Sequence, residues 1–99
     1  MAVDVMIKRK ITPGHQAKQM VPLLLKMRAM ALNQIGYISG ETLCNVENPE
    51  DCLVISRWQT VEDWYRWFHS SKRSVIEEKI ESLTGEKTTY SIYAPMVPR

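Results

Sequence analysis

The chain of 99 residues has room for one domain, spanning residues 1–99, with one hydrophobic core. Hydrophobic residues make up 44% of it and charged residues 24%, which is ordinary for a soluble globular protein. The net charge is only +2, and the basic groups Lys8, Arg9, Lys10 and Lys72, Arg73 are short, so we expect solvated surface and no nucleic-acid partner. The longest apolar stretch is far below the roughly 20 residues that span a membrane, and the first residues lack the order of a signal peptide. We therefore expect a cytoplasmic protein without membrane contact.

The first predicted element is a strand over residues 3–12. Val3, Val5 and Ile7 alternate along one side of it, while charged residues enter the other side. Pro13 and Gly14 break the pattern and end the strand.

A long helix is predicted over residues 15–35. Apolar residues recur at three- and four-residue steps, at Met20, Leu23, Leu24, Met27 and Ala31. Pro22 lies inside this pattern and removes one backbone hydrogen bond, so it either kinks the helix or marks a frayed first turn. Asn33 and Gly36 close the helix.

Two strands, residues 36–46 and 52–59, form a predicted hairpin around the turn at residues 47–51. Residues 53–55 are apolar in succession, which predicts that both faces of the second strand are buried. Cys44 and Cys52 flank the turn, so their sulfurs approach each other if these residues pair across the hairpin. In a reducing cytoplasm we expect free thiols, and the spacing of Cys and His residues predicts no metal site.

Two helical pieces and a last strand complete the chain. Residues 60–70 begin with Thr60, a good N-cap, and residues 72–83 follow as a second piece. On the second piece, five residues are expected to share one largely apolar face: Val75, Ile76, Lys79, Ile80 and Leu83. Its acidic residues Glu77, Glu78 and Glu81 are expected on a solvated face. Residues 87–94 form the last strand, before a proline-broken tail.

The order β-α-β-β-α-β predicts an α+β, ferredoxin-like fold. Right-handed crossovers then give a four-stranded antiparallel sheet with the helices on one face. The other face is left bare although it carries apolar residues, and a second copy of the chain is the simplest cover for it. We therefore expect a homodimer packed sheet to sheet.

The stretch from Trp58 to Arg73 holds five of the eight aromatic residues. On a helix that begins near Thr60, the residues spaced for a core stripe are Val61, Trp64, Tyr65 and Phe68. Trp67 lies at the flank of this stripe, where a ring either covers an edge of the core or lines a cleft. His69 lies near the helix end as a half-exposed capping residue or as a general base, since its unperturbed pKa is near neutral.

The same stretch carries a resemblance to a known family. A strand ends in Trp58, Glu62 and Asp63 follow at a helix start, and Trp67 and Ser70 come next. With the element order and the "TPG" after the first strand, this resembles the antibiotic biosynthesis monooxygenase (ABM) domain. The resemblance implies a dimeric α+β barrel with a small apolar pocket in each subunit. It also implies oxygenation of polycyclic phenols or quinols by O₂, without metal or flavin, in which the substrate anion reduces oxygen.

A haem-degrading branch of the family is similar at Trp67. The motif of that branch also has an Asn in the first strand and a His about ten residues after the Trp. This chain has Ile7 and Glu77 at those positions, so the resemblance argues against haem degradation.

These observations favour an ABM-type domain that binds a flat aromatic molecule and oxygenates it without a cofactor. Trp67, Trp64, Trp58 and Tyr37 are the predicted substrate-binding residues. No motif identifies the proton acceptor, so His69, Tyr65 and Tyr37 are candidates by their chemistry. A non-catalytic ligand-binding or interaction module is the alternative, with the aromatic rings as plain core.

Overall fold

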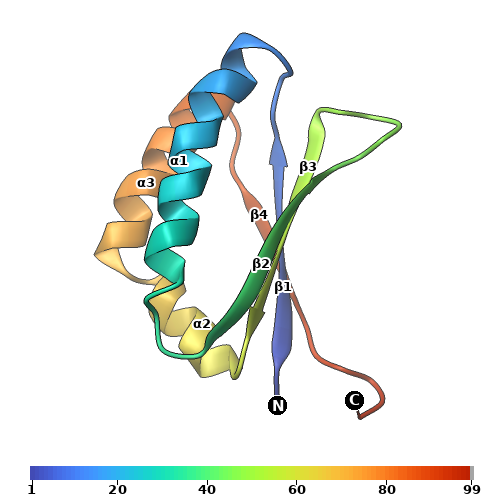
Figure 1. The fold of residues 1–99 in the computed structure, drawn as a ribbon, viewed down its shortest axis with the longest axis vertical. Helices are drawn as coiled ribbons and strands as arrows, with labels where there is room; N and C mark the ends of the chain where they lie inside the picture. Colours follow the sequence, from blue (N-terminus) through green and yellow to red (C-terminus); the bar gives the residue numbers. More distant parts are fainter. Residues whose placement is uncertain (99) are drawn as a thin grey trace.

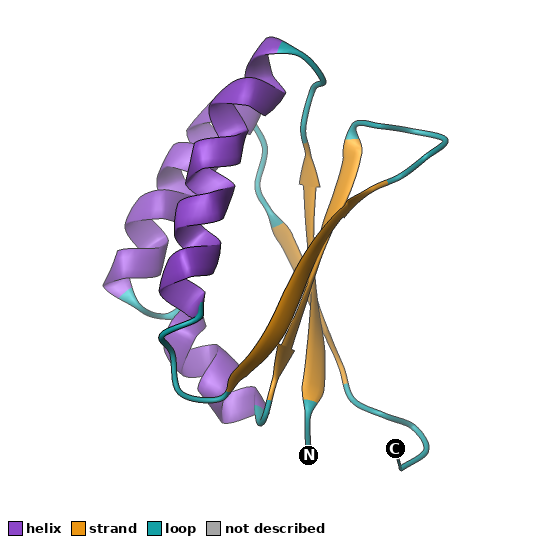
Figure 2. Ribbon diagram, viewed as in Figure 1, coloured by secondary structure: helices purple, strands orange, loops and turns teal. Residues whose placement is uncertain are grey.

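The computed structural model describes residues 1–98 and has two layers, a sheet and a layer of helices (Figure 1). In chain order its elements are β1 (Val3–Lys10), α1 (His15–Ala31), β2 (Tyr37–Cys44), β3 (Asp51–Trp58), α2 (Val61–Phe68), α3 (Ser71–Thr84) and β4 (Thr89–Tyr93). The strands lie in the order β2-β3-β1-β4, with every neighbouring pair antiparallel. All three helices cover one face of the sheet (Figure 2). The predicted ferredoxin-like fold is confirmed, with the second helical segment divided at His69 and Ser70.

The inner face of the sheet follows from strict alternation along β1. Val3, Val5, Ile7 and Arg9 are buried towards the helices, and the residues between them face away. Trp58, Ser56, Val54 and Cys52 lie opposite these four on β3 and therefore share the inner face. Two groups of buried side chains pack between the layers, one around Trp58 and Trp64 and one around Met20 and Ile80.

Helix α1 is continuous from His15 to Ala31 and passes through Pro22. It begins seven residues before Pro22, so a frayed first turn at Pro22 is the wrong alternative. The helix ends four residues earlier than predicted, and the chain turns back through Gly36. Within residues 1–98, no helix is long and apolar enough to cross a membrane.

Gly36 has a positive φ of 87°, and a Cβ at this position would overlap the side chain of Asp63. We expect Gly36→Ala to lower the free energy of unfolding by about 2–4 kcal/mol, from left-handed strain and this overlap. Gly14 is the matched control, because its φ is 93° and a Cβ added there would meet no atom within 4 Å. Urea denaturation of both Ala variants checks this, and equal losses would contradict a role for the Asp63 contact.

Thr60 is the N-cap of helix α2, as predicted. The hydroxyl of Thr60 accepts a hydrogen bond from the backbone N–H of Asp63 at 3.1 Å. The buried residues of α2 are Trp64 and Trp67, whereas Tyr65 is 47% exposed. The predicted core stripe was therefore wrong at Tyr65, because the short helix turns its Trp67 side towards the sheet. Val75 of α3 is also exposed, and Arg73 and Glu77 are buried with Ile76 and Ile80.

The hairpin of β2 and β3 pairs its two cysteines with each other, which is the condition under which the sequence brings their sulfur atoms together. Cys44 and Cys52 are direct partners across the two strands, with Sγ atoms 2.9 Å apart, and both are free thiols. Both side chains belong to the inner face, since Cys52 lies opposite Arg9 of β1.

The face of the sheet away from the helices has no cover in the part of the chain that the structure describes (Figure 2). Its side chains include Met6, Leu43, Leu53, Ile55 and Tyr93. Residues 53–55 are only half-buried in this single chain, so the prediction that both faces of β3 are buried was wrong for the chain by itself.

Candidate functional site

A cavity lies between α1 and the inner face of the sheet. Helix α1 contributes Leu24, Met27, Arg28 and Ala31 to its lining, and β2 contributes Tyr37, Gly40, Glu41 and Thr42. The enclosed volume is about 60 Å³, within an empty space of about 530 Å³ that opens to solvent. The enclosed part holds only a few water molecules, so an aromatic ligand has to extend into the mouth.

The mouth of the cavity is formed by adaptable side chains. Arg28 is exposed there, and Met27 is half-buried. Long unbranched side chains change rotamer at low cost, and Met fits irregular ligands well. The cavity can therefore widen at α1 without a change in the sheet.

The aromatic wall of the cavity is made by Trp64 and Trp67, which are 2% and 3% exposed. Trp67 belongs to the buried core and also lines the cavity. The two roles that the sequence offered for this ring, covering an edge of the core and lining a cleft, are therefore both present. Trp58 is fully buried behind the wall, with its ring 5.8 Å from that of Trp64. Its Nε1–H donates to the Oγ of Ser56 at 2.8 Å, and Ser56 itself lines the cavity.

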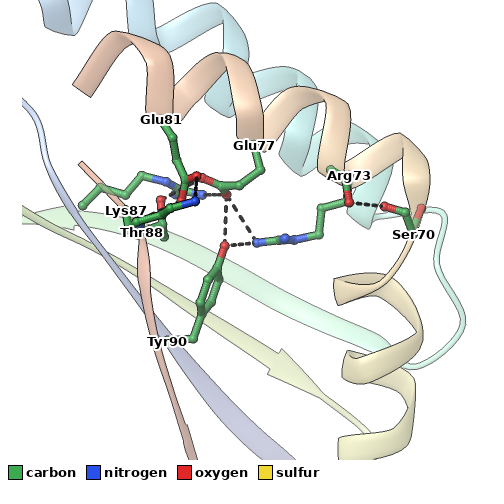
Figure 3. Close-up of polar contacts among 9 residues, drawn as sticks. Ser70, Arg73, Glu77, Glu81, Lys87, Thr88 and Tyr90 are labelled. Atoms are coloured by element: carbon green, nitrogen blue, oxygen red, sulfur yellow. Dashed lines mark hydrogen bonds and ion pairs between the residues drawn. The ribbon is translucent and has the colours of Figure 1, made fainter. Parts of the chain in front are cut away.

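A group of charges that includes Arg73 and Glu77 is buried beneath α3 (Figure 3), and Arg73 brings it against the aromatic wall at Trp64. Oε1 of Glu77 accepts from Arg9 Nη2 at 2.7 Å and from Arg73 Nη2 at 3.3 Å. Tyr90 donates its hydroxyl to the same oxygen at 3.1 Å and accepts from Arg73. The second oxygen of Glu77 accepts from the hydroxyl of Thr88 at 2.7 Å. Glu77 thus holds together β1, β4 and α3 from a single carboxylate.

This charge cluster, which we define as Arg9, Arg73, Glu77 and Tyr90, has an excess of positive charge. Two guanidinium groups and one carboxylate leave one net positive charge, and Arg9 and Arg73 both line the cavity. Nε of Arg9 is buried and has no hydrogen-bond partner among the described residues. A buried donor without a partner is costly, so a ligand oxygen that reached this N–H would gain a hydrogen bond.

Aromatic rings support the second guanidinium of the cluster. Cζ of Arg73 lies 4.9 Å from the ring centre of Phe68, 5.1 Å from that of Tyr90 and 5.6 Å from that of Trp64. Burial raises the pKa of Tyr90, and the charge of Glu77 adds to the rise, although Arg73 opposes it. Tyr90 therefore remains a hydrogen-bond donor at neutral pH.

The sequence profile of the antibiotic biosynthesis monooxygenase family matches residues 2–79 of the chain. The chain belongs to this family. The match covers the cavity's strand residues, its aromatic wall and three members of the charge cluster. No curated protein sequence matches the chain closely enough to count as a relative.

Solved structures share the fold of this ABM domain. A conserved protein from Methanosarcina mazei Go1 has a TM-score of 0.84 and 19% identity, over 94% of this chain and 91% of that one. SnoaB from Streptomyces nogalater, described as a cofactor-independent oxygenase, has a TM-score of 0.83 and 11% identity, over 98% and 95%. An antibiotic biosynthesis monooxygenase assigned by similarity in Nitrosomonas europaea has 0.83 and 9%, over 98% and 92%. At these identities the likeness establishes the fold.

The ABM cavity includes some of the residues that the sequence pointed to. Trp67, Trp64 and Tyr37 line it, whereas Trp58 lies behind the wall and acts on the cavity only through Ser56. The two predicted catalytic residues, Tyr65 and His69, are absent from the lining; Tyr65 is exposed and His69 lies at the surface end of α2. His69 caps the end of α2 and packs its ring edge-on against Phe68 at 5.1 Å.

Sequence reasoning missed the charge cluster. Arg9, Arg73 and Glu77 were predicted as solvated residues, and this was wrong, because all three are buried. The signal was present in the periodicity. Arg9 continues the alternation of Val3, Val5 and Ile7, and Glu77 is in phase with Arg73 and Ile80 on α3.

The described residues also limit what else the site can hold. Within residues 1–98, no group of three or more His, Cys, Asp or Glu side chains converges as metal ligands do. The site offers guanidinium groups, hydroxyls and aromatic rings. These groups suit an oxygen-bearing aromatic ligand better than a metal ion.

Proposed function

We propose that this ABM domain is a cofactor-independent monooxygenase of a flat phenol or quinol. The observation that carries the proposal is the net positive charge cluster at the aromatic cavity, with the unpaired N–H of Arg9. A phenolate is the species that transfers electrons to O₂ in such chemistry, and a buried cation stabilises it. An opposite charge within a few ångströms lowers the pKa of an acid by about 1–3 units.

The reaction then needs orientation, a dry site and removal of one proton. Trp64 and Trp67 stack against the ring of the substrate, and Arg9 and Arg73 stabilise its oxyanion. For an anthrone-type substrate, the methylene carbon supplies four electrons. One oxygen atom of O₂ becomes the new carbonyl, and the other leaves as water with the two hydrogens of that carbon.

The proton of the substrate hydroxyl leaves through the mouth. Tyr37 lines the cavity, and we assign its hydroxyl as the hydrogen-bond partner of the substrate hydroxyl and as the group that passes the proton on to water. Glu41 is the cross-strand partner of Ile55, so its carboxylate points to the outer face of the sheet and takes no part. Tyr65 and His69, the other two candidate acceptors from the sequence, do not line the cavity, and the geometry gives these roles no support.

We also propose that the chain is a homodimer through the outer face of the sheet. This face carries exposed apolar residues such as Leu43 and Tyr93 beside half-buried Leu53 and Ile55. Apolar area of this kind on a sheet is normally covered, and a two-fold dimer covers it on both copies at once.

The test of the proposed activity is oxygen uptake by the metal-stripped protein with hydroquinones, naphthols and anthrones, each against a blank without protein. We expect uptake above the blank that a chelator leaves unchanged. Arg9→Met removes the net positive charge and leaves Glu77 paired with Arg73. Lys8→Met is the matched control, since the same charge is lost from the adjacent, exposed residue of β1.

The pH dependence separates a chemical role of Arg9 from a structural one. Loss of the cation raises the pKa of the bound phenol, so activity at neutral pH falls and recovers at higher pH. We expect the pH of half-maximal uptake to rise by about 1 unit or more in Arg9→Met and to stay constant in Lys8→Met. A rate that falls equally at every pH would show that Arg9 acts on the fold alone, and no uptake with any substrate would overturn the proposed activity.

One observation favours a second candidate, a binding module without catalysis. Neither His15 nor His69 lines the cavity, so the site lacks the side chain that most often serves as general base. Ligand binding that is lost in Trp67→Ala, without oxygen uptake in the parent protein, would identify this second function.

Haem does not fit the described residues. Ile7 has no donor atom, and both oxygens of Glu77 are already occupied by protein partners. A titration with haem that gives no shift of the Soret band would agree with this geometry.

A further inference from the structure

We propose that Cys44 and Cys52 are a thiol–disulfide exchange site, at which a low-molecular-weight disulfide such as oxidised glutathione closes a reversible bond between β2 and β3. The proposal goes beyond the oxygenase activity and does not depend on it. It rests on the strand register, on the distance between the sulfur atoms and on the unequal exposure of the two residues.

The register puts the two residues in the position that a disulfide requires. Cys44 and Cys52 are direct cross-strand partners. The next pair along the hairpin is hydrogen-bonded, because Asn45 N donates to Asp51 O at 2.8 Å. Bonded and non-bonded pairs alternate, so Cys44 and Cys52 form the closer kind of pair, with Cα atoms about 4.5 Å apart. This separation lies within the range that disulfides span without backbone movement.

The turn holds this register in place. The side-chain oxygen of Asn45 accepts from the backbone N–H groups of Glu47 and Asn48, at 2.9 and 3.3 Å. Its amide nitrogen donates to the carboxylate of Asp51 at 3.2 Å. The sulfur atoms are therefore 2.9 Å apart in an ordered hairpin, and small side-chain rotations suffice to join them.

The two thiols have different surroundings, which assigns their order of reaction. Cys44 is exposed, whereas Cys52 is 5% exposed and its thiol also lies near the carbonyl oxygen of Pro49. Burial raises the pKa of Cys52 to about 12, with the neighbouring Cys44 and Asp51 adding to the rise. Cys44 therefore reacts first with a molecule from solution, and Cys52 reacts second, within the protein.

The exchange is balanced in two steps. The thiolate of Cys44 attacks one sulfur of the small disulfide, forms a mixed disulfide and releases one small thiolate. Cys52 then loses its proton to this thiolate, which becomes the first small thiol, and attacks Sγ of Cys44. This releases the second small thiolate, which takes from water the proton that Cys44 gave up and becomes the second small thiol. The protein loses two hydrogen atoms, and the small disulfide gains them as two thiols.

The disulfide between Cys44 and Cys52 would lie in the wall of a second groove. Cys44 and Cys52 line an apolar groove of about 340 Å³ with Met20 and Val21 of α1. The groove shares Leu24 and Thr42 with the cavity described above. Among the described residues, β2 is an edge strand that pairs with β3 alone, so the disulfide would add a covalent link between the edge of the groove and the rest of the sheet.

The experiment exposes the reduced full chain to oxidised glutathione, quenches with acid, alkylates the remaining thiols and measures intact mass. We expect loss of two hydrogen atoms, no alkylation, no covalent dimer and a Tm raised by about 10 °C, all reversed by dithiothreitol. The chain has two cysteines, so no other internal disulfide exists. The double variant Cys44→Ser with Cys52→Ser is the background and should show no change.

The single variants test the order of reaction. Cys52→Ser should accumulate a stable glutathione adduct on Cys44, whereas Cys44→Ser should remain unmodified until it is denatured. Circular dichroism verifies the fold of each variant, and Ala replaces Ser where a Ser variant is unfolded. A stable glutathione adduct on the parent chain, a disulfide between two chains, or closure only in denaturant would each overturn the proposal.

Discussion

Replacement of Glu77 by Gln is expected to lower the free energy of unfolding by about 3–5 kcal/mol, which is a large share of the stability of a small domain. Gln keeps the shape of the side chain and removes its charge. Arg9 and Arg73 then remain buried without a counter-ion, because Glu77 is the carboxylate that both contact, at 2.7 and 3.3 Å. Taking the partner from a buried charge costs far more than the pair itself contributes.

Urea denaturation of Glu77→Gln measures this loss, and Glu78→Gln is the matched control. Glu78 is the next residue on α3 and is exposed, so its replacement should change stability by less than about 0.5 kcal/mol. Similar results for the two variants would mean that the buried cluster contributes little to folding.

Replacement of Trp64 by Ala is expected to lower the free energy of unfolding by about 3–5 kcal/mol. The indole ring is 2% exposed and contacts the rings of Trp58, Phe68 and Tyr90, with centroid distances of 5.8, 5.7 and 6.0 Å. It also supports the guanidinium of Arg73 at 5.6 Å. Its removal therefore leaves a void at the junction of the core, the cavity wall and the charge cluster.

Tyr65→Ala is the control for this second prediction, since Tyr65 follows Trp64 on the same helix and is 47% exposed. We expect it to cost less than about 1 kcal/mol in the same urea titration. If Trp64→Ala is obtained only unfolded, Trp64→Phe allows the comparison with a smaller loss. Equal effects at Trp64 and Tyr65 would contradict the rotation of α2 that buries Trp67 in place of Tyr65.

The two predictions concern one structural unit. Arg73 is bound to Glu77 and lies over the ring of Trp64, so the cavity wall and the charge cluster stabilise each other. For this reason the activity test uses Arg9→Met, which leaves both contacts of Arg73 in place. A site in which the same side chains hold the fold and stabilise an anion gains rigidity where the proposed reaction needs orientation.

The element order followed from local patterns in the sequence. Alternation in β1, three- and four-residue spacing in α1, the cap at Thr60 and the turn between Cys44 and Cys52 each depend on residues close together in the chain. The antiparallel sheet with helices on one face then followed from connection rules. The aromatic wall was also visible, since Trp64 and Trp67 lie in one short helix.

The sequence by itself determined the topology of this ABM domain and half of its candidate site, the aromatic half. Only the tertiary structure decided the charged half and removed Tyr65 and His69 from the cavity. Arg9 and Glu77 are 68 positions apart, and a charged residue is normally solvated unless a distant partner neutralises it. Local periodicity reports which face of an element a residue occupies. The packing of β1, α3 and β4 against one another decides whether a charge on that face meets water or a counter-ion.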